Sequence, residues 1–179
     1  MSSDALESLR FPVGRFVVKK DATAADRAQW FGAIERAPAE LAAAVAGLST
    51  DQFSTPYRDG GWTVAQVIHH VADSHLNAYA RCRWVLTEPN FTVKPYDEKA
   101  WANLTDARGT DVTPSLDLLR GLHVRWVTLL RSLDAREFAR ELHHPERGPM
   151  TLDSLVQLYA WHGHHHAAHI LALRKRHGW

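Results

Sequence analysis

Cysteine is nearly absent from this 179-residue sequence, in which Cys82 is the only one. A single thiol excludes an internal disulfide framework and is typical of a protein that folds in a reducing compartment. The opening segment MSSDALESLRFPVGRF lacks the basic start and the apolar centre of a secretory signal peptide. We therefore expect a cytoplasmic protein.

Long hydrophobic runs and an excess of one charge are also missing. No stretch of the sequence reaches the roughly 18 uninterrupted apolar residues that a transmembrane helix needs. The 21 lysines and arginines are balanced by 20 aspartates and glutamates, so no strong field attracts nucleic acid or an anionic membrane. We expect neither class of partner.

Period-two alternation, the pattern of half-buried strands, does not persist long enough to predict a sheet. Four segments instead repeat apolar residues at helical spacing. We expect helices over about residues 23–48, 63–86, 113–133 and 151–177, with a short helical piece in DAREFAR after the third. Helices of this length in one chain predict an all-α protein, a four-helix bundle.

Residues 1–179 fit a single domain, in which residues 1–22 form an N-terminal arm. The stretch from about Glu88 to Asp111 contains several aromatic side chains and is too apolar for a flexible linker. We expect it to be a long ordered loop between the second and third helices, and such loops are often functional.

Several helix ends carry recognisable signals. Thr23 is placed to cap the first helix, and Pro38 is expected to kink or divide it. The second helix starts with the capping box TVAQ at residues 63–66. The Thr-Pro pair at residues 113–114 predicts a cap followed by proline at the first helical position, and Gly178 ends the fourth helix.

Histidines are concentrated in WHGHHHAAH, residues 161–169, which holds five of the twelve in the chain. Residues four apart share one helix face, so His162 pairs with His166, and His165 with His169. The apolar stripe of this helix includes His166 and has His162 at its edge. Burial favours the neutral imidazole, the form that first-row transition metals bind. The spacing therefore indicates His162 and His166 as metal ligands, although hydrogen-bonded core histidines would give the same pattern.

A reactive zinc site generally takes three protein ligands, so a third is expected from another helix. The second predicted helix offers His69, His70 and His75. His75 lies at the centre of the apolar stripe of that helix, His70 lies on its flank, and His69 turns outward. Spacing alone ranks His75 slightly ahead of His70.

Four motifs, taken together, resemble the DinB/YfiT-like superfamily of four-helix metal proteins. They are PYRDGGW at 56–62, GGWTVAQVIHHVADSH at 60–75, KPYDEKAW at 94–101 and WHGHHHAAHI at 161–170. The resemblance covers the chain from about Phe11 to Trp179. It implies that the first ligand falls on His70, in place of His75, and that the other two fall on His162 and His166. Many relatives have glutamine where this chain has His169.

The resemblance also implies an activity. The YfiT-type branch is described as metal-dependent hydrolases and is linked to bacillithiol S-transferases. We expect one divalent ion per chain, zinc by preference and nickel as the alternative, with bound water or a thiolate as the nucleophile. The substrate is then a small molecule, and in the transferase alternative a low-molecular-weight thiol is transferred to an electrophile. The resemblance further implies a homodimer, which is also the commonest closed assembly.

A third hypothesis is a non-catalytic, metal-binding stress protein whose ion is structural. Around the expected ligands, four residues are candidates for contacting the substrate or orienting the ligands: His75, Tyr96, Asp97 and His165.

Other conspicuous residues receive structural interpretations. Cys82 lies in an apolar stripe with no base beside it, so we expect a core thiol. Trp62 and Trp161 adjoin the ligand motifs, and packing at helix ends is the expected role. His143 and His144 precede a proline, and we expect a surface loop.

Overall fold

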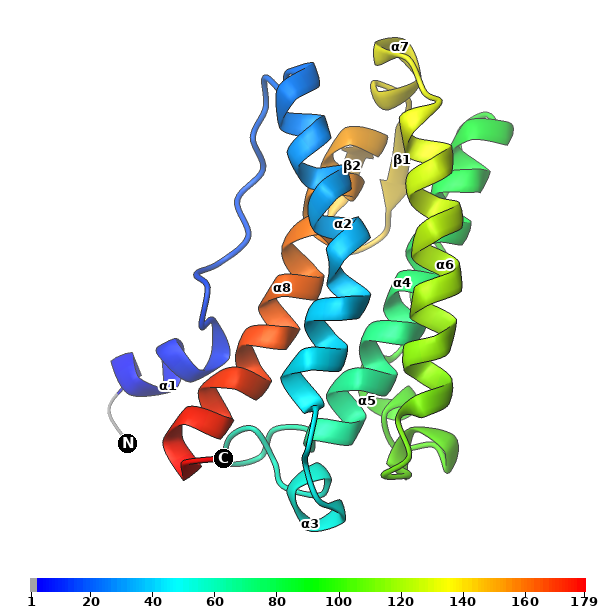
Figure 1. Ribbon diagram of the computed structural model, residues 1–179. Helices are drawn as coiled ribbons and strands as arrows, with labels where there is room; N and C mark the ends of the chain where they lie inside the picture. The colour runs from blue at the N-terminus through cyan, green and yellow to red at the C-terminus, as the bar shows by residue number, and fades with distance from the viewer. Residues whose placement is uncertain (1–2) are drawn as a thin grey trace.

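Four long helices form the body of the computed structural model, which describes residues 3–179 (Figure 1). They are α2 (Ala24–Val45), α4 (Val64–Thr87), α6 (Thr113–Arg131) and α8 (Leu152–His177). Helix α2 packs against α8 and α6, and α4 packs against the same two helices, so the order around the bundle is α2, α8, α4, α6. The prediction of a four-helix bundle is thereby confirmed.

The long connection after α4 sets the helix directions. In Figure 1, α2 and α8 run downward and α4 and α6 run upward, because residues 88–112 return the chain along the bundle before α6 begins. This ordered segment contains α5 (Glu98–Trp101) and a 3₁₀ helix (Asp106–Arg108). The remaining short helices are α1 (Ser3–Arg10), α3 (Thr50–Phe53) and α7 (Ala135–Phe138).

Most helix ends follow the local sequence signals. Thr23 caps α2 and exchanges hydrogen bonds with Asp26, and Thr63 forms the predicted capping box at the start of α4. Helix α8 ends at Gly178, whose positive φ of 71° suits glycine.

Two expectations need correction. Pro38 does not divide α2, which continues through it as one element. Thr113 is already the first residue of α6 and does not cap it; Oδ1 of Asp111 instead accepts a hydrogen bond from the backbone N–H of Thr113.

A β-hairpin between α7 and α8 was not expected. Strands β1 (Glu141–His144) and β2 (Gly148–Thr151) pair antiparallel. The burial of β1 alternates, with Leu142 and His144 inward, and the backbone at residue 143 also bonds to Phe91 and Val93. The expected surface loop at residues 143–144 is therefore a strand, and its four-residue alternation is too short to detect in a sequence.

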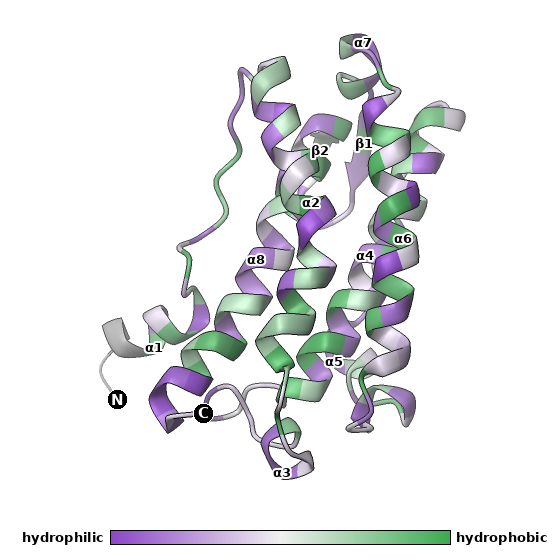
Figure 2. Ribbon diagram, in the orientation of Figure 1, coloured by the Kyte–Doolittle hydropathy of each residue, from purple (hydrophilic) through white to green (hydrophobic). Residues whose placement is uncertain are grey.

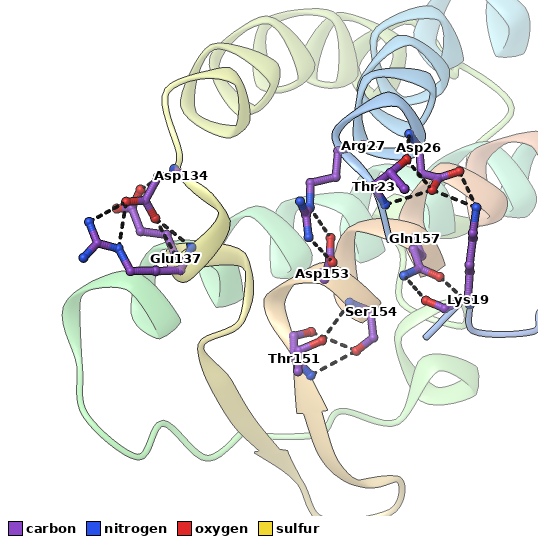
Figure 3. Close-up of polar contacts among 11 residues, drawn as sticks. Lys19, Thr23, Asp26, Arg27, Asp134, Glu137, Thr151, Asp153, Ser154 and Gln157 are labelled. Carbon is purple, nitrogen blue, oxygen red and sulfur yellow. Dashed lines mark hydrogen bonds and ion pairs between the residues drawn. The ribbon is translucent and has the colours of Figure 1, made fainter. Parts of the chain in front are cut away.

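Polar contacts hold the start of α8 against the start of α2 (Figure 3). Arg27 forms a two-pronged ion pair with Asp153, at 2.9 and 2.7 Å. Gln157 receives a hydrogen bond from the backbone of Lys19 and returns one to its carbonyl. The segment that precedes α2 is thereby fixed along α8.

The buried apolar residues form two clusters, one toward each end of the bundle. The first contains Phe31, Trp126 and Leu152, and the second contains Leu41, Ile68 and Ile170. Each of α4, α6 and α8 contributes residues to both clusters, and the buried histidines of these helices lie near the boundary between the two clusters. Figure 2 shows hydrophobic and hydrophilic positions interleaved along all four helices. Within residues 3–179, no helix is long and apolar enough to cross a membrane.

Candidate metal centre

Helices α4 and α8 bring three imidazoles together between the two apolar clusters. One ring nitrogen each from His70, His162 and His166 lies within 4.8 Å of the others, a grouping that could hold a metal ion. The Nε2 atoms of His162 and His166 are 3.2 Å apart. The spacing of four residues on α8 and the packing of α4 against α8 produce this convergence.

A chain of hydrogen bonds runs from His162 into the core. Its Nδ1 lies 3.1 Å from Nε2 of His75, and Nδ1 of His75 lies 2.9 Å from Nε2 of His123. Nδ1 of His123 lies 2.5 Å from the carbonyl oxygen of Ile34 on α2. Three imidazoles from α8, α4 and α6 thus end on a backbone carbonyl of α2.

The carbonyl fixes the direction of every bond in this chain. The oxygen of Ile34 only accepts, so Nδ1 of His123 donates and its neutral ring leaves Nε2 as an acceptor. His75 must then donate through Nδ1, and it accepts through Nε2 from Nδ1 of His162. The lone pair of His162 is left on Nε2, the atom that faces His166.

Burial keeps these rings neutral. It lowers the pKa of His70 to about 4 and holds the pKa values of His162 and His166 well below the usual histidine range, with neighbouring imidazoles adding to the effect. Nδ1 of His166 is buried and has no hydrogen-bond partner among the described residues. Neutral imidazoles with converging lone pairs are the donor set that zinc and its neighbours prefer.

The spacing of two of these nitrogens also fits a tetrahedral ion. Zinc–nitrogen bonds of about 2.0–2.1 Å at tetrahedral angles place two ligand nitrogens about 3.3–3.4 Å apart. The observed 3.2 Å between His162 and His166 is close to that value. The residues present therefore fit a divalent metal.

The three imidazoles line a cavity of about 300 Å³ under the hairpin and the long loop. Its wall combines apolar side chains with many polar groups, among them Arg81, Tyr96, Glu98 and His144. Trp62 lies over His70, with ring centroids 4.4 Å apart. A concave cavity with converging polar groups is typical of a small-molecule site.

Comparison with known proteins identifies the family. The family model described as the DinB superfamily matches residues 33–170. The chain belongs to the DinB superfamily. A relative from Geobacillus thermodenitrificans, named "Putative metal-dependent hydrolase", is 50% identical over 176 residues, covering 97% of this chain and 98% of the relative.

A second relative of this DinB-superfamily chain also has a solved structure. "Putative metal-dependent hydrolase YfiT" from Bacillus subtilis is 44% identical over 173 residues, covering 96% of this chain and 97% of the relative. Its structure, described as "a probable metal-dependent hydrolase with an unusual four-helix bundle topology", superimposes with a TM-score of 0.94 over 96% of this chain and 99% of that one.

The other predicted site residues have different positions. His75 is fully buried and contacts His162 without joining the three-nitrogen group. Tyr96 and His165 line the cavity, and His165 stacks on Trp161 at 4.2 Å. Asp97 does not line it, because its carboxylate caps α5 through the backbone of residues 99 and 100.

Three structural interpretations have clear outcomes. Cys82 is a fully buried core thiol, as expected, and burial raises its pKa to about 12. Trp62 lies just before the start of α4, close to the helix end that was expected, whereas Trp161 lies within α8 and not at its end; both line the cavity. His144, expected in a surface loop, is a buried part of the wall.

Sequence reasoning did not identify His123 or Arg81 as part of the site. His123 occupies an apolar stripe of α6 between Leu119 and Trp126, and this placement was a readable signal of a buried polar group. Arg81 follows His70 on α4 by 11 residues, or about three turns, and so shares its face of the helix. The hairpin that covers this face gave no comparable signal.

Proposed function

We propose that this protein is a metal-dependent hydrolase acting on a small molecule. Its ion is held by His70, His162 and His166, with zinc as the first choice and nickel as the alternative. The observation that carries the proposal is the convergence of three neutral imidazole nitrogens within 4.8 Å at the wall of a cavity. A zinc ion with three protein ligands keeps an open position, where it polarises a substrate oxygen and lowers the pKa of water.

The residues around the ligands have separate tasks in this proposal. The hydrogen-bond chain through His75 and His123 orients His162 with Nε2 free. Trp62 packs on His70 and limits its rotation. Burial raises the pKa of Tyr96, so its hydroxyl stays protonated and is available to donate a hydrogen bond to negative charge that develops on the substrate.

In this proposal the nucleophile comes from outside the chain. Cys82 is enclosed in the core with its pKa raised to about 12, and no cysteine or lysine is among the residues that line the cavity. Water suits this arrangement, and so does an external thiol, which is the observation that keeps thiol transfer to an electrophile as the second candidate.

A screen of the zinc- and nickel-loaded protein tests the proposal. Ester, amide and phosphoester panels run beside low-molecular-weight thiols paired with electrophiles. We expect turnover that requires the metal and is lost in His166→Ala, while His164→Ala, an exposed position on the same helix, keeps it. Stoichiometric metal of unchanged affinity in His166→Ala would overturn the ligand assignment. Bound metal without turnover in any panel would favour a structural ion.

A further inference from the structure

Arg81 is a buried cation without an anionic partner. The residue is 8% exposed, and among the side chains that the structure describes its guanidinium makes no hydrogen bond and no ion pair. The guanidinium makes a cation–π contact with the ring of Tyr96, whose centroid lies 5.9 Å from the guanidinium carbon. Buried charges are normally paired, because removing an unpaired charge from water is costly. The unused donors therefore need an explanation.

The donors belong to the same cavity as the three imidazoles. His70, Ser74 and Arg81 all line it from α4, at positions i, i+4 and i+11 on one face of the helix. Eleven residues correspond to about 16 Å along the helix axis. Helical side chains lean toward the N-terminus, so Arg81 leans toward the His70 end of the cavity. The cavity therefore has a candidate metal site at one end and a guanidinium toward the other.

Among the described residues that line this cavity, Arg81 is the one charged side chain that is buried. The other charged lining residues, Glu98, Glu146 and Arg147, are exposed. Burial raises the pKa of the Glu98 carboxyl and the charges of Arg147 and Arg81 partly offset this rise, but among the described residues no ion pair joins Glu98 to Arg81. The lining histidines are held neutral by burial, and the positive charge of Arg81 contributes further to lowering the pKa of His144. At the Arg81 end of the cavity, the single charge of the guanidinium is matched by a monoanion such as a carboxylate.

We propose that Arg81 binds a carboxylate of the substrate, so that the site accepts small carboxylic acids whose reactive group lies at the His70–His162–His166 end. The planar guanidinium presents paired N–H donors that match a carboxylate. This inference rests on the proposed function for the role of the histidine end, but the recognition by Arg81 is testable separately.

The test measures binding to the cobalt-substituted protein. 3-Mercaptopropionate is compared with 3-mercaptopropanol, and 6-mercaptohexanoate with 6-mercaptohexanol, through the thiolate-to-cobalt charge-transfer absorption. Within each pair the sulfur ligand is the same and only the far end differs. For the chain length that spans the cavity, we expect the acid to bind about ten- to a hundred-fold more tightly than the alcohol.

Three variants test whether Arg81 is responsible for the tighter binding of the acid. Arg81→Gln should abolish it while the alcohol still binds, which shows that the variant folds and keeps its metal site. Arg81→Lys should retain part of it, because the charge remains and the fork is lost. Arg83→Gln is the matched control, since Arg83 is an exposed residue of α4 that does not line the cavity. Equal binding of acid and alcohol at every length, or a preference that survives in Arg81→Gln, would overturn the inference.

A second measurement separates this inference from the proposed function. Hexanoate and hexanol are titrated into metal-free protein, with the change in intrinsic tryptophan fluorescence, to which Trp62 and Trp161 at the cavity wall contribute, as the signal. Absence of charge transfer with every thiol would contradict an open metal position. A hexanoate preference that depends on Arg81 would still support the carboxylate site in that case, and equal binding of hexanoate and hexanol would overturn it.

Discussion

Nδ1 of His162 lies 3.1 Å from Nε2 of His75, and this contact determines which nitrogen of His162 faces the candidate metal site. His75 is itself held by His123, whose Nδ1 donates to the carbonyl of Ile34. Metal-binding histidines normally donate their second N–H to such an acceptor, which fixes the ring and strengthens it as a ligand. Here the acceptor is another neutral imidazole, held by two further helices.

Removing the acceptor should weaken metal binding. We expect His75→Leu to lower zinc affinity about ten- to a hundred-fold, because His162 loses its orienting partner. His75→Gln keeps a carbonyl oxygen as acceptor and should lose less. Competition with a chromophoric chelator measures both affinities, and His164→Ala is the exposed control on α8. Unchanged affinity in a folded His75→Leu protein would show that the contact does not support the metal.

A second prediction concerns the close approach of α8 to α2. A Cβ atom at Gly163 would lie 2.9 Å from Cβ of Ala37 and 3.5 Å from Cε1 of His75. Alanine normally stabilises a helix relative to glycine by about 1 kcal/mol. We expect Gly163→Ala to destabilise the protein instead, by about 1–3 kcal/mol, because the helices must separate.

Gly121 provides the comparison for this substitution. It lies within α6, and a Cβ atom added there would meet no neighbouring group within 4 Å. Gly121→Ala should therefore be neutral or stabilising by up to about 1 kcal/mol. Chemical denaturation of the two variants measures the difference, and equal stability of Gly163→Ala and Gly121→Ala would contradict the steric argument.

The relative positions of His70 and His75 show how far the sequence could lead. Helical periodicity correctly placed His75 deepest in the core, where it is fully buried. His70, which lines the cavity, instead lies on the flank of the apolar stripe of α4, where periodicity placed it. The ranking by depth was therefore a good prediction of burial and a poor guide to which residue faces the cavity. The family resemblance was needed to select His70.

The cavity wall was harder to predict than the helices. Capping signals at residues 23 and 63 and the glycine at 178 depend on neighbours in sequence, so the sequence contained them. The hairpin instead depends on its pairing with itself and on contacts with the loop at residues 91–93. Long-range pairing of such short strands leaves almost no local periodicity.

A third prediction concerns the ion pair between Arg27 and Asp153, which joins the first turns of α2 and α8 (Figure 3). Both side chains are less than one-fifth exposed, at 17% and 15%. We expect Asp153→Asn to destabilise the protein by about 1–3 kcal/mol, because it leaves the guanidinium without its charged partner. The exposed pair of Arg136 with Asp134 is the comparison, and Asp134→Asn should lose no more than about 1 kcal/mol through that ion pair.

Double-mutant cycles make the comparison quantitative. Arg27→Gln combined with Asp153→Asn should show a coupling above that of Arg136→Gln combined with Asp134→Asn. The cycle cancels the contribution of Asp134 as the cap of α7, which the single variant also changes. Equal coupling in the two cycles would mean that burial does not strengthen the Arg27 pair.

The last prediction is a loss of stability in acid for the metal-free protein. Burial lowers the pKa of His169 to about 4, from 6.5 for an unperturbed histidine. Between these values the unfolded chain binds a proton that the folded chain does not, so the free energy of unfolding decreases as pH falls from about 6.5 to about 4. Below that range both states are protonated and this contribution has been lost.

Substitution of His169 measures how much this residue contributes to the loss of stability in acid. His169→Gln does not titrate in this range, and its amide can still donate to the carbonyl of Arg10, to which Nε2 of His169 is hydrogen bonded at 3.1 Å. We expect the variant to lose about 2–3 kcal/mol less than the parent between pH 7 and pH 4, measured by urea unfolding in the presence of a chelator. His177→Gln is an exposed control and should behave as the parent. An identical acid loss in His169→Gln and the parent would mean that His169 is not held neutral by the fold.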